Sequence, residues 1–324
     1  MLTVLLRRLG QSFFVVLTMA TLVFFGINIV GDPVAMLVSP DADQAEMERV
    51  IRDFGLDKPV WEQFWLFLKG VVQGDFGTSF VFGEPALQLI LERLPATLEL
   101  AFSALFLAVA IGLPLGLLAG LFPEWWVSKT IMALSILGFS LPTFWVGIML
   151  IMTFAVSLGW LPSTGRGETA GLLGMETSIL TLDGLRHLFL PALNLALLKI
   201  SLVIRLTRAG VRETMQQDYI KFARAKGLSQ WRIVRVHVLK VVLIPVVTVL
   251  GLEFGSLIAF SVVTESIFAW PGMGKLLIEA ILQLDRPLIV AYLMLIAVVF
   301  VTINLLVDLI YTALDPRVRL GGTA

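Results

Sequence analysis

Four polar residues lie within or near the ends of long apolar segments, where polar side chains are costly and therefore informative. They are Asn194, Lys199, Glu253 and Glu265. Polar groups at membrane depth usually face the interior of a helix bundle or a water-filled path, so we interpret all four as candidates for a translocation path. Glu253, in "GLEFGS", could attract an amine or a metal cation. For Glu253 an ion pair with Lys199 inside the bundle is an equal alternative, and for Asn194 and Lys199 a structural role is the favoured interpretation.

Few residues suit catalytic or metal chemistry. The two histidines, His187 and His237, lie in different predicted loops, and there is no cysteine, so neither a histidine cage nor a thiolate site is expected. No G-x-x-x-x-G-K-[ST] string exists to bind nucleotide phosphates. "PGMGKLL", at residues 271–277, lacks that spacing and predicts a turn before a short external helix. We therefore expect a non-catalytic chain without a metal or cofactor of its own.

The whole chain has the composition of a membrane protein. Hydrophobic residues make up 58% of it and charged residues 15%, with a mean hydropathy of +0.92, whereas soluble domains are roughly 45–50% apolar and about 25% charged. A membrane-crossing helix needs about 20 mostly apolar residues. Six segments meet or approach this length: residues 9–30, 98–121, 131–158, 188–206, 241–268 and 288–311. The first is too long for a signal-peptide core and lacks a cleavage site, so we expect it to be retained.

The distribution of Lys and Arg orients these spans. The net charge is +0, but nine basic residues lie between residues 205 and 240. Cytoplasmic loops of membrane proteins are enriched in Lys and Arg, so we expect this loop and both termini to be cytoplasmic. Trp125, Trp126, Trp160 and Trp270 lie near predicted span ends, which is typical of an aromatic belt at the membrane surface.

The spans divide the chain into four predicted parts. They are an N-terminal tail with the first helix (1–30), an external loop (31–97), a five-helix core that includes the 205–240 loop (98–311), and a C-terminal tail (312–324). The external loop carries apolar residues at helical spacing in two places, so we expect two short amphipathic helices that lie on or cap the membrane protein. These residues are Met47, Val50, Ile51 and Phe54, followed by Trp61, Phe64, Trp65 and Leu68.

The 205–240 loop has a pattern that charge retention alone does not explain. A helix is predicted from Arg212, and Gly227 ends it because glycine adopts positive φ without strain. Ser229 is placed to cap a second helix that carries Trp231 and leads into the fifth span. One face of the first helix is predicted to hold Met215, Tyr219, Phe222 and Ala223. A short helix with an apolar edge and a basic rim fits a groove of another protein.

The segment "YIKFARAKGLSQWRIVRVHVLKVVLIPVV" resembles the coupling-loop motif of binding-protein-dependent ATP-binding-cassette import permeases, in the dipeptide, oligopeptide and nickel branch. The wider family has a Glu-Ala-Ala triplet before its glycine, whereas only Ala223 remains here. Other segments also resemble the first permease subunit of this branch: "FGLDKPVWEQF", "GDFGTSF", "RLPATLEL", "LPTFWVG", "WLPSTG", "ESIFAWPGMGKLL" and "LDPRVR". The resemblance covers nearly the whole chain.

The resemblance implies an all-α polytopic protein of the bacterial cytoplasmic (inner) membrane with six transmembrane helices, a large external loop after the first, and a cytoplasmic coupling helix between the fourth and fifth. It implies a second homologous permease, two cytoplasmic ATPase subunits that bind ATP and Mg, and an external, periplasmic substrate-binding protein. Tyr219, Phe222 and Ala223 would then be buried in the ATPase groove, and Arg224 and Lys226 would make polar contacts there. The full coupling set is Asp218, Tyr219, Phe222, Ala223, Arg224, Ala225, Lys226, Gly227, Leu228 and Ser229.

The solute is the least determined property. Di- or oligopeptides are the leading expectation for this branch, followed by nickel chelates, opines and glutathione, and the binding protein largely selects among them. An ATP-independent secondary transporter is a more remote alternative, because such carriers usually show repeated halves, and the two halves of this sequence do not match. Nothing in the sequence suggests a nucleic-acid partner.

Overall fold

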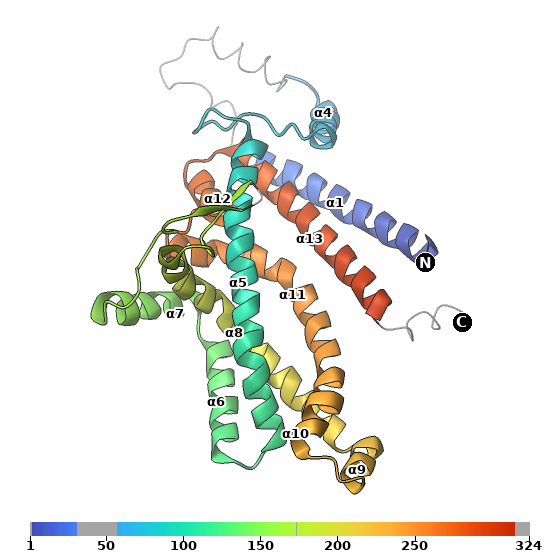
Figure 1. Cartoon of the computed structure of the whole chain (residues 1–324). Helices are drawn as coiled ribbons and strands as arrows, with labels where there is room; N and C mark the ends of the chain where they lie inside the picture. The colour runs from blue at the N-terminus through green and yellow to red at the C-terminus, as the bar shows by residue number, and fades with distance from the viewer. Residues whose placement is uncertain (1, 31–56, 173, 315–324) are drawn as a thin grey trace. The chain divides into compact units, whose positions relative to one another are not determined.

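The computed structural model describes residues 2–30, 57–172 and 174–314, and the chain is mostly helical there (Figure 1). The elements are α1 (Leu2–Val30), α4 (Val60–Gln73), α5 (Ala86–Leu121), α6 (Trp126–Ser140), α7 (Thr143–Leu150), η1 (Ile151–Ser157), β1 (Ala170–Leu172), β2 (Met175–Thr177), α8 (Leu182–Met215), α9 (Asp218–Ala225), α10 (Gln230–Ile233), η2 (Val234–Val238), α11 (Leu239–Ile267), α12 (Met273–Leu282) and α13 (Arg286–Leu314). The amphipathic helix predicted over residues 47–54 lies outside the described residues.

Several helices are long and apolar enough to cross a membrane. Within the described residues, four meet this test: α5, α8, the continuous helix Gln230–Ile267 and Arg286–Val307 of α13. A bent pair of helices makes a fifth if it counts as one span, and α1 is apolar over Gly10–Gly26. The chain is therefore a polytopic membrane protein, and the number six stays a prediction.

The third predicted span is not one continuous helix. Residues 126–157 form two helical segments, Trp126–Ser140 and Thr143–Ser157, which bend by 109° at the break between them. Pro142 is the cause, because the ring of a proline disfavours helical backbone in the residue before it. Leu141 accordingly has an extended conformation, with ψ of 137°. The prediction of one helix over 131–158 is wrong for this reason.

The described residues form two compact units: those within 1–94 and 272–305, and those within 95–271 and 306–314. In the second unit, α5 and α8 approach very closely. Every fourth residue of α5 is a glycine here, and a Cβ added at Gly112, Gly116 or Gly120 would lie 2.6–2.7 Å from a side-chain carbon of α8. The α8 residues concerned are Val203, Thr207 and Val211. The absence of a side chain on α5 is therefore what permits this packing.

A small hairpin interrupts the helical fold of the second unit. β1 and β2 are antiparallel, with Ala170 opposite Thr177. This hairpin of the described residues departs from the expectation of an all-α chain, because an alternation over three residues per strand is too short to distinguish from loop in the sequence.

In the first unit, the loop after α4 is fastened to the start of α13. Asp285 is fully buried, and Ser79 donates its hydroxyl hydrogen to the Asp285 carboxylate. The backbone N–H groups of Phe80 and Val81 point at the same carboxylate, each with a donor–acceptor distance of 3.3 Å. The Leu288 backbone N–H is a fourth donor to this carboxylate, at 3.4 Å, so the buried charge is satisfied and the contact fixes the loop.

Candidate functional site

Two of the predicted path residues form an ion pair. The ammonium of Lys199, on α8, donates to the Glu253 carboxylate on α11, and Lys199 also donates to the Ser256 hydroxyl at 2.9 Å. Ser256 in turn donates to Glu253 Oε2 at 2.8 Å. The structure therefore shows the ion pair that the sequence left open as an alternative.

The same pair is not fully enclosed by this chain. The Glu253 side chain retains 35% of its exposure and Lys199 retains 14%. Within the described residues, only Oε2 of Glu253 accepts hydrogen bonds, so Oε1 remains available. A carboxylate that faces hydrocarbon is strongly disfavoured. The face that carries Glu253 therefore suits a water-filled path or a partner chain, and does not suit lipid.

The other two predicted path residues are enclosed. Asn194 and Glu265 are both fully buried. Asn194 Nδ2 donates to the Thr264 hydroxyl at 3.0 Å, and Glu265 accepts from the hydroxyls of Thr97 (2.7 Å) and Ser261 (2.8 Å). These bonds join α8 to α11 and α5 to α11. The structure favours a structural role for Asn194 and Glu265 in this conformation.

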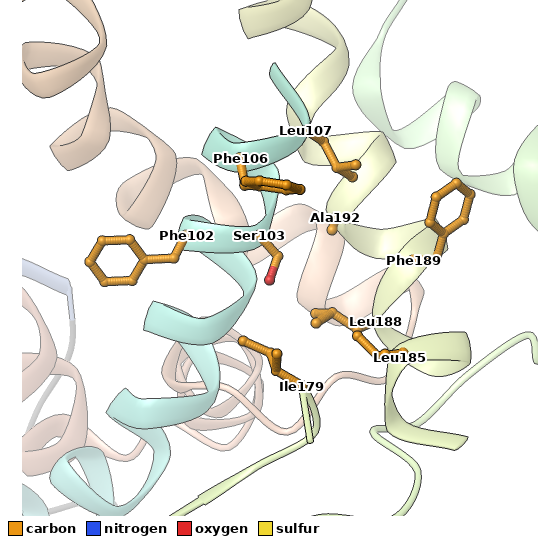
Figure 2. Close-up of a pocket in the computed structure, with 9 residues that line it drawn as sticks. All are labelled: Phe102, Ser103, Phe106, Leu107, Ile179, Leu185, Leu188, Phe189 and Ala192. Carbon is orange, nitrogen blue, oxygen red and sulfur yellow. The ribbon is translucent and has the colours of Figure 1, made fainter. Parts of the chain in front are cut away.

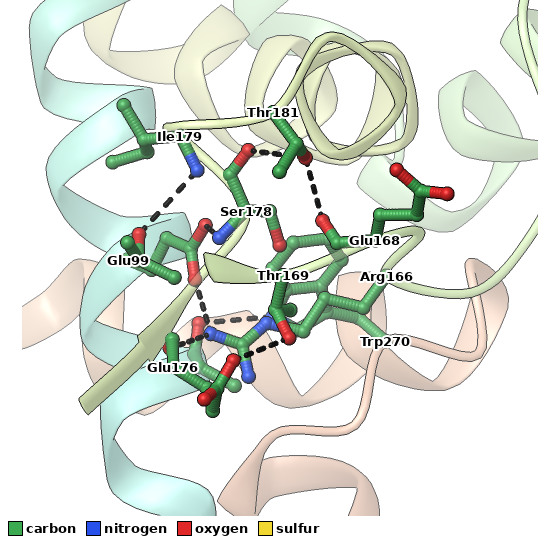
Figure 3. Close-up of polar contacts among 11 residues, drawn as sticks. Glu99, Arg166, Glu168, Thr169, Glu176, Ser178, Ile179, Thr181 and Trp270 are labelled. Atoms are coloured by element: carbon green, nitrogen blue, oxygen red, sulfur yellow. Dashed lines mark hydrogen bonds and ion pairs between the residues drawn. The ribbon is translucent and has the colours of Figure 1, made fainter. Parts of the chain in front are cut away.

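A buried polar network that the sequence analysis missed holds the β1–β2 hairpin (Figure 3). Glu99 on α5 is almost fully buried and accepts from the Arg166 guanidinium and from the Ser178 backbone N–H, the latter at 2.7 Å. Arg166 also donates to the Glu176 carbonyl at 2.6 Å. Glu99 and Arg166 have opposite charges near predicted span ends on the same side of the membrane, which is the signal that could have identified them.

Trp270 completes this network, and its predicted place in an aromatic belt is wrong. Its side chain is fully buried, its indole N–H donates to the Ala96 carbonyl at 2.9 Å, and the Arg166 guanidinium lies 5.8 Å from its ring centroid. Ala269, just before it, has a φ of 48°, so the chain turns sharply and points the indole inward. The remaining predicted belt residues are exposed, as expected: Trp125, Trp126 and Trp160.

The predicted glycine turn after α9 is confirmed. Gly227 has a φ of 75°, its N–H donates to the Arg224 carbonyl at 2.9 Å, and the Leu228 N–H donates to the Ala223 carbonyl at 3.2 Å. These two bonds form a Schellman motif, which ends a helix in a fixed geometry. Ser229 occupies the predicted N-cap position of α10, but its side chain makes no capping hydrogen bond.

The faces of α9 differ from the prediction. The helix predicted from Arg212 stops at Met215 and resumes at Asp218, because Gln217 is extended with ψ of 146°. Met215, Tyr219, Phe222 and Ala223 therefore do not share one face. Ala223 is buried within this chain together with Ile220, whereas Tyr219 and Phe222 are 46% and 61% exposed.

Charged residues surround the exposed aromatic residues of α9. The Lys226 ammonium lies 4.5 Å from the Phe222 ring centroid. Asp218 and Lys221 form an exposed ion pair at 2.8 Å, and the hydrogen bond from Lys221, followed by its charge, lowers the pKa of Asp218 below its ordinary value. The next helix, α10, exposes 71% of Trp231. Three exposed aromatic side chains on a basic loop form a surface suited to a protein partner.

A groove of about 570 Å³ lies between α5 and α8 (Figure 2). Ser103 supplies the one hydroxyl among the side chains that line it, which are Phe102, Ser103, Phe106, Leu107, Ile179, Leu185, Leu188, Phe189 and Ala192. A solute with charged groups would lose its hydration there without gaining partners. The groove therefore fits apolar chains and does not extend the polar face around Glu253.

Comparisons with known proteins decide the family. Residues 112–320 match the family described as "Binding-protein-dependent transport system inner membrane component", and residues 1–101 match "Binding-prot-dependent transport system membrane comp, N-term". The chain belongs to this family. It is 36% identical over 337 residues to the dipeptide transport system permease protein DppB of Escherichia coli K12, with 98% of this chain and 99% of that protein covered. It is also 36% identical over 320 residues to the glutathione transport system permease protein GsiC of Escherichia coli O1:K1, with the same coverage.

A solved structure supports the fold of this permease independently. One chain of an inward-facing MetNI methionine ABC transporter superposes with a TM-score of 0.53 at 19% identity, covering 70% of this chain and 97% of that chain. The family match and the named relatives make the protein a multi-pass permease subunit of an ATP-binding-cassette importer in the inner membrane, and permeases of this family are not themselves catalytic. Both the Lys199–Glu253 pair and the α9–α10 surface lie within the segment that matches the family.

Proposed function

We propose that this permease pairs with a second, similar permease and imports peptides or peptide-like small solutes that an external binding protein delivers. The two E. coli relatives support this solute class, since one is named for dipeptides and the other for glutathione, which is itself a small peptide. Two cytoplasmic cassette ATPases, with ATP and Mg bound to them, power the transport. Import of nickel chelates or opines by the same machinery is the alternative.

The observation that carries the coupling proposal is the geometry of α9. Its inner face, with Ile220 and Ala223, is buried in this chain, and its outer face exposes Tyr219 and Phe222. The Schellman turn at Gly227 fixes where the helix ends. A helix held on one side and aromatic on the other can transmit a rigid-body movement from a partner. Within the proposed coupling set, Ala223 thus supports the helix from inside, while Tyr219, Phe222, Arg224 and Lys226 contact the ATPase.

The charge distribution sets the orientation in this proposal. The 205–240 loop and both termini are cytoplasmic, because that loop carries nine of the chain's basic residues. The β1–β2 hairpin and α4 then lie on the external side. Glu253 faces the translocation path from the middle of its span, and its free Oε1 can accept from the amine of a passing solute.

The test is co-purification of this chain from its native membranes in mild detergent, with identification of every subunit recovered. We compare the wild type with Phe222→Asp and with Lys221→Ala, a change at the neighbouring exposed position of the same helix. The wild type and Lys221→Ala should retain a second permease and cassette ATPases. Phe222→Asp should retain the second permease and lose the ATPases, since it places a charge in the buried contact. Equal ATPase retention by Phe222→Asp, or none by the wild type, would overturn the coupling proposal.

A further inference from the structure

α4 has two apolar faces, and α1 covers only one of them. The rings of Phe64 and Phe67 lie 5.2 and 5.5 Å from the ring of Phe24, and the rings of Phe64 and Phe25 stack at 6.0 Å. Four aromatic side chains thus hold α4 against α1 within the first unit. This contact accounts for the inner face of α4 and leaves the opposite face uncovered by any described residue.

The uncovered face is rich in tryptophan. Trp61 and Trp65 are 66% and 65% exposed, and Val72 is 88% exposed. These three positions are spaced by four and seven residues, so they form one stripe along the helix. Lys69 is exposed between Trp65 and Val72 and makes no ion pair with the described residues. A stripe of this size would be unfavourable in water, which indicates that something covers it.

The position of α4 identifies the covering material. Phe24 and Phe25 lie in the last two turns of the first predicted span (9–30), near the end at which we expect α1 to leave the hydrocarbon layer. α4 packs on this end of α1 through Phe64 and Phe67. A helix that packs at that depth and presents tryptophan on its other side is suited to the membrane surface. Tryptophan is enriched at that depth, and a lysine stem can run along apolar surface to a phosphate group.

We propose that α4 is an interfacial anchor embedded in the lipid headgroup layer. Trp61, Trp65 and Val72 enter the boundary between headgroups and acyl chains, and the Lys69 ammonium binds a phospholipid phosphate. The loop that follows α4 runs to the contact with Asp285. The anchor therefore fixes the distance of this loop from the membrane surface. The assignment of α4 to the external leaflet rests on the proposed orientation of the chain. The insertion of α4 into a headgroup layer does not depend on that orientation.

The absence of cysteine makes the test direct, because a single introduced cysteine can be spin-labelled without removing others. Trp65→Cys and Val72→Cys are labelled in the assembled transporter in nanodiscs of phosphatidylethanolamine and phosphatidylglycerol. Glu84→Cys, at an exposed loop position outside α4, is the control. Collision rates with oxygen, which partitions into lipid, and with a water-soluble nickel chelate give the depth of each label.

The labels at positions 65 and 72 should collide at least several-fold more with oxygen than with the chelate, relative to the label at 84. Lys69→Glu in the Trp65→Cys background should raise the chelate collision rate. Two results would overturn the anchor. Chelate access at 65 and 72 equal to that at 84 would place the face in water. Protection from both reagents, whether permanent or only after addition of the binding protein, would show that protein covers it.

Discussion

Lys199 on α8 and Glu253 on α11 neutralise each other within two membrane helices, while one carboxylate oxygen stays free of hydrogen bonds from the described residues. Removal of either partner alone leaves a charge without its counterion. A fully buried pair loses about 3–5 kcal/mol in that case, and partial exposure of Glu253 lowers the expected loss to about 2 kcal/mol. The pair thus combines a structural contact with a polar site on the face suited to the path.

The first prediction separates these two roles. Lys199→Met should lower the thermal unfolding temperature in detergent, and the double variant Lys199→Met with Glu253→Gln should recover most of that loss, because no uncompensated charge remains. If Glu253 also serves the path, the recovered double variant should still transport more slowly than the wild type in proteoliposomes. Full recovery of uptake together with stability would remove Glu253 from the path.

The second prediction concerns the network that holds the β1–β2 hairpin. Glu99→Gln weakens charge-assisted hydrogen bonds worth about 1.5–3 kcal/mol, so hydrogen exchange of residues 170–177 should accelerate by roughly ten- to hundredfold. Glu168→Gln makes the same charge change at an exposed neighbouring position and should leave exchange unaltered. Similar exchange in both variants would show that Glu99 does not fasten the hairpin.

The third prediction concerns the turn at Gly227. A Cβ at this position would meet no atom within 4 Å, so the cost of a side chain comes from the backbone alone. Positive φ costs most L-residues about 1–2 kcal/mol, whereas asparagine tolerates it. The Gly227→Val and Gly227→Pro chains should insert normally, but transporters assembled with them should hydrolyse ATP without matching uptake, whereas Gly227→Asn should stay coupled. Normal uptake by the valine variant would contradict the role of this turn in coupling.

The fourth prediction concerns the close packing of α5 on α8. In Gly116→Ala, the added Cβ would lie 2.6 Å from Thr207 Cβ and 2.9 Å from a backbone oxygen, so the helices must separate. Overpacking of this kind costs about 1–3 kcal/mol. Gly10→Ala, where a Cβ meets nothing within 4 Å, is the matched control. Fluorescence-detected gel filtration after graded heating measures the difference, and equal thermal midpoints would refute this account of the packing.

Hydropathy and charge predicted the membrane class and most spans, because both follow from composition over long windows. The Pro142 break was missed since apolar residues continue on both sides of it. The glycine turn at 227 was predicted because only local backbone geometry determines it. The exposed and buried faces of α9 were not predicted correctly, because the interruption at Gln217 shifts the helical phase between Met215 and Tyr219.

Some polar contacts could be predicted from the sequence and others could not. Lys199 and Glu253 were recognised because they interrupt apolar sequence. Glu99 and Arg166 are 67 residues apart in the chain and lie at predicted span ends, where charge is ordinary. Only the fold brings them together. Trp270 likewise has the sequence context of a surface tryptophan and is buried because of the turn at Ala269.

The three glycines of α5 also determine which movements are mechanically permitted. Val203, Thr207 and Val211 of α8 fill the space where α5 lacks side chains, so α8 can neither slide along α5 nor rotate against it without collision. The chain passes from α8 into α9 through Gln216 and Gln217 alone. If α9 couples to an ATPase as proposed, a force on α9 would move α8 and α5 together as one rigid unit, because their close packing prevents sliding between them.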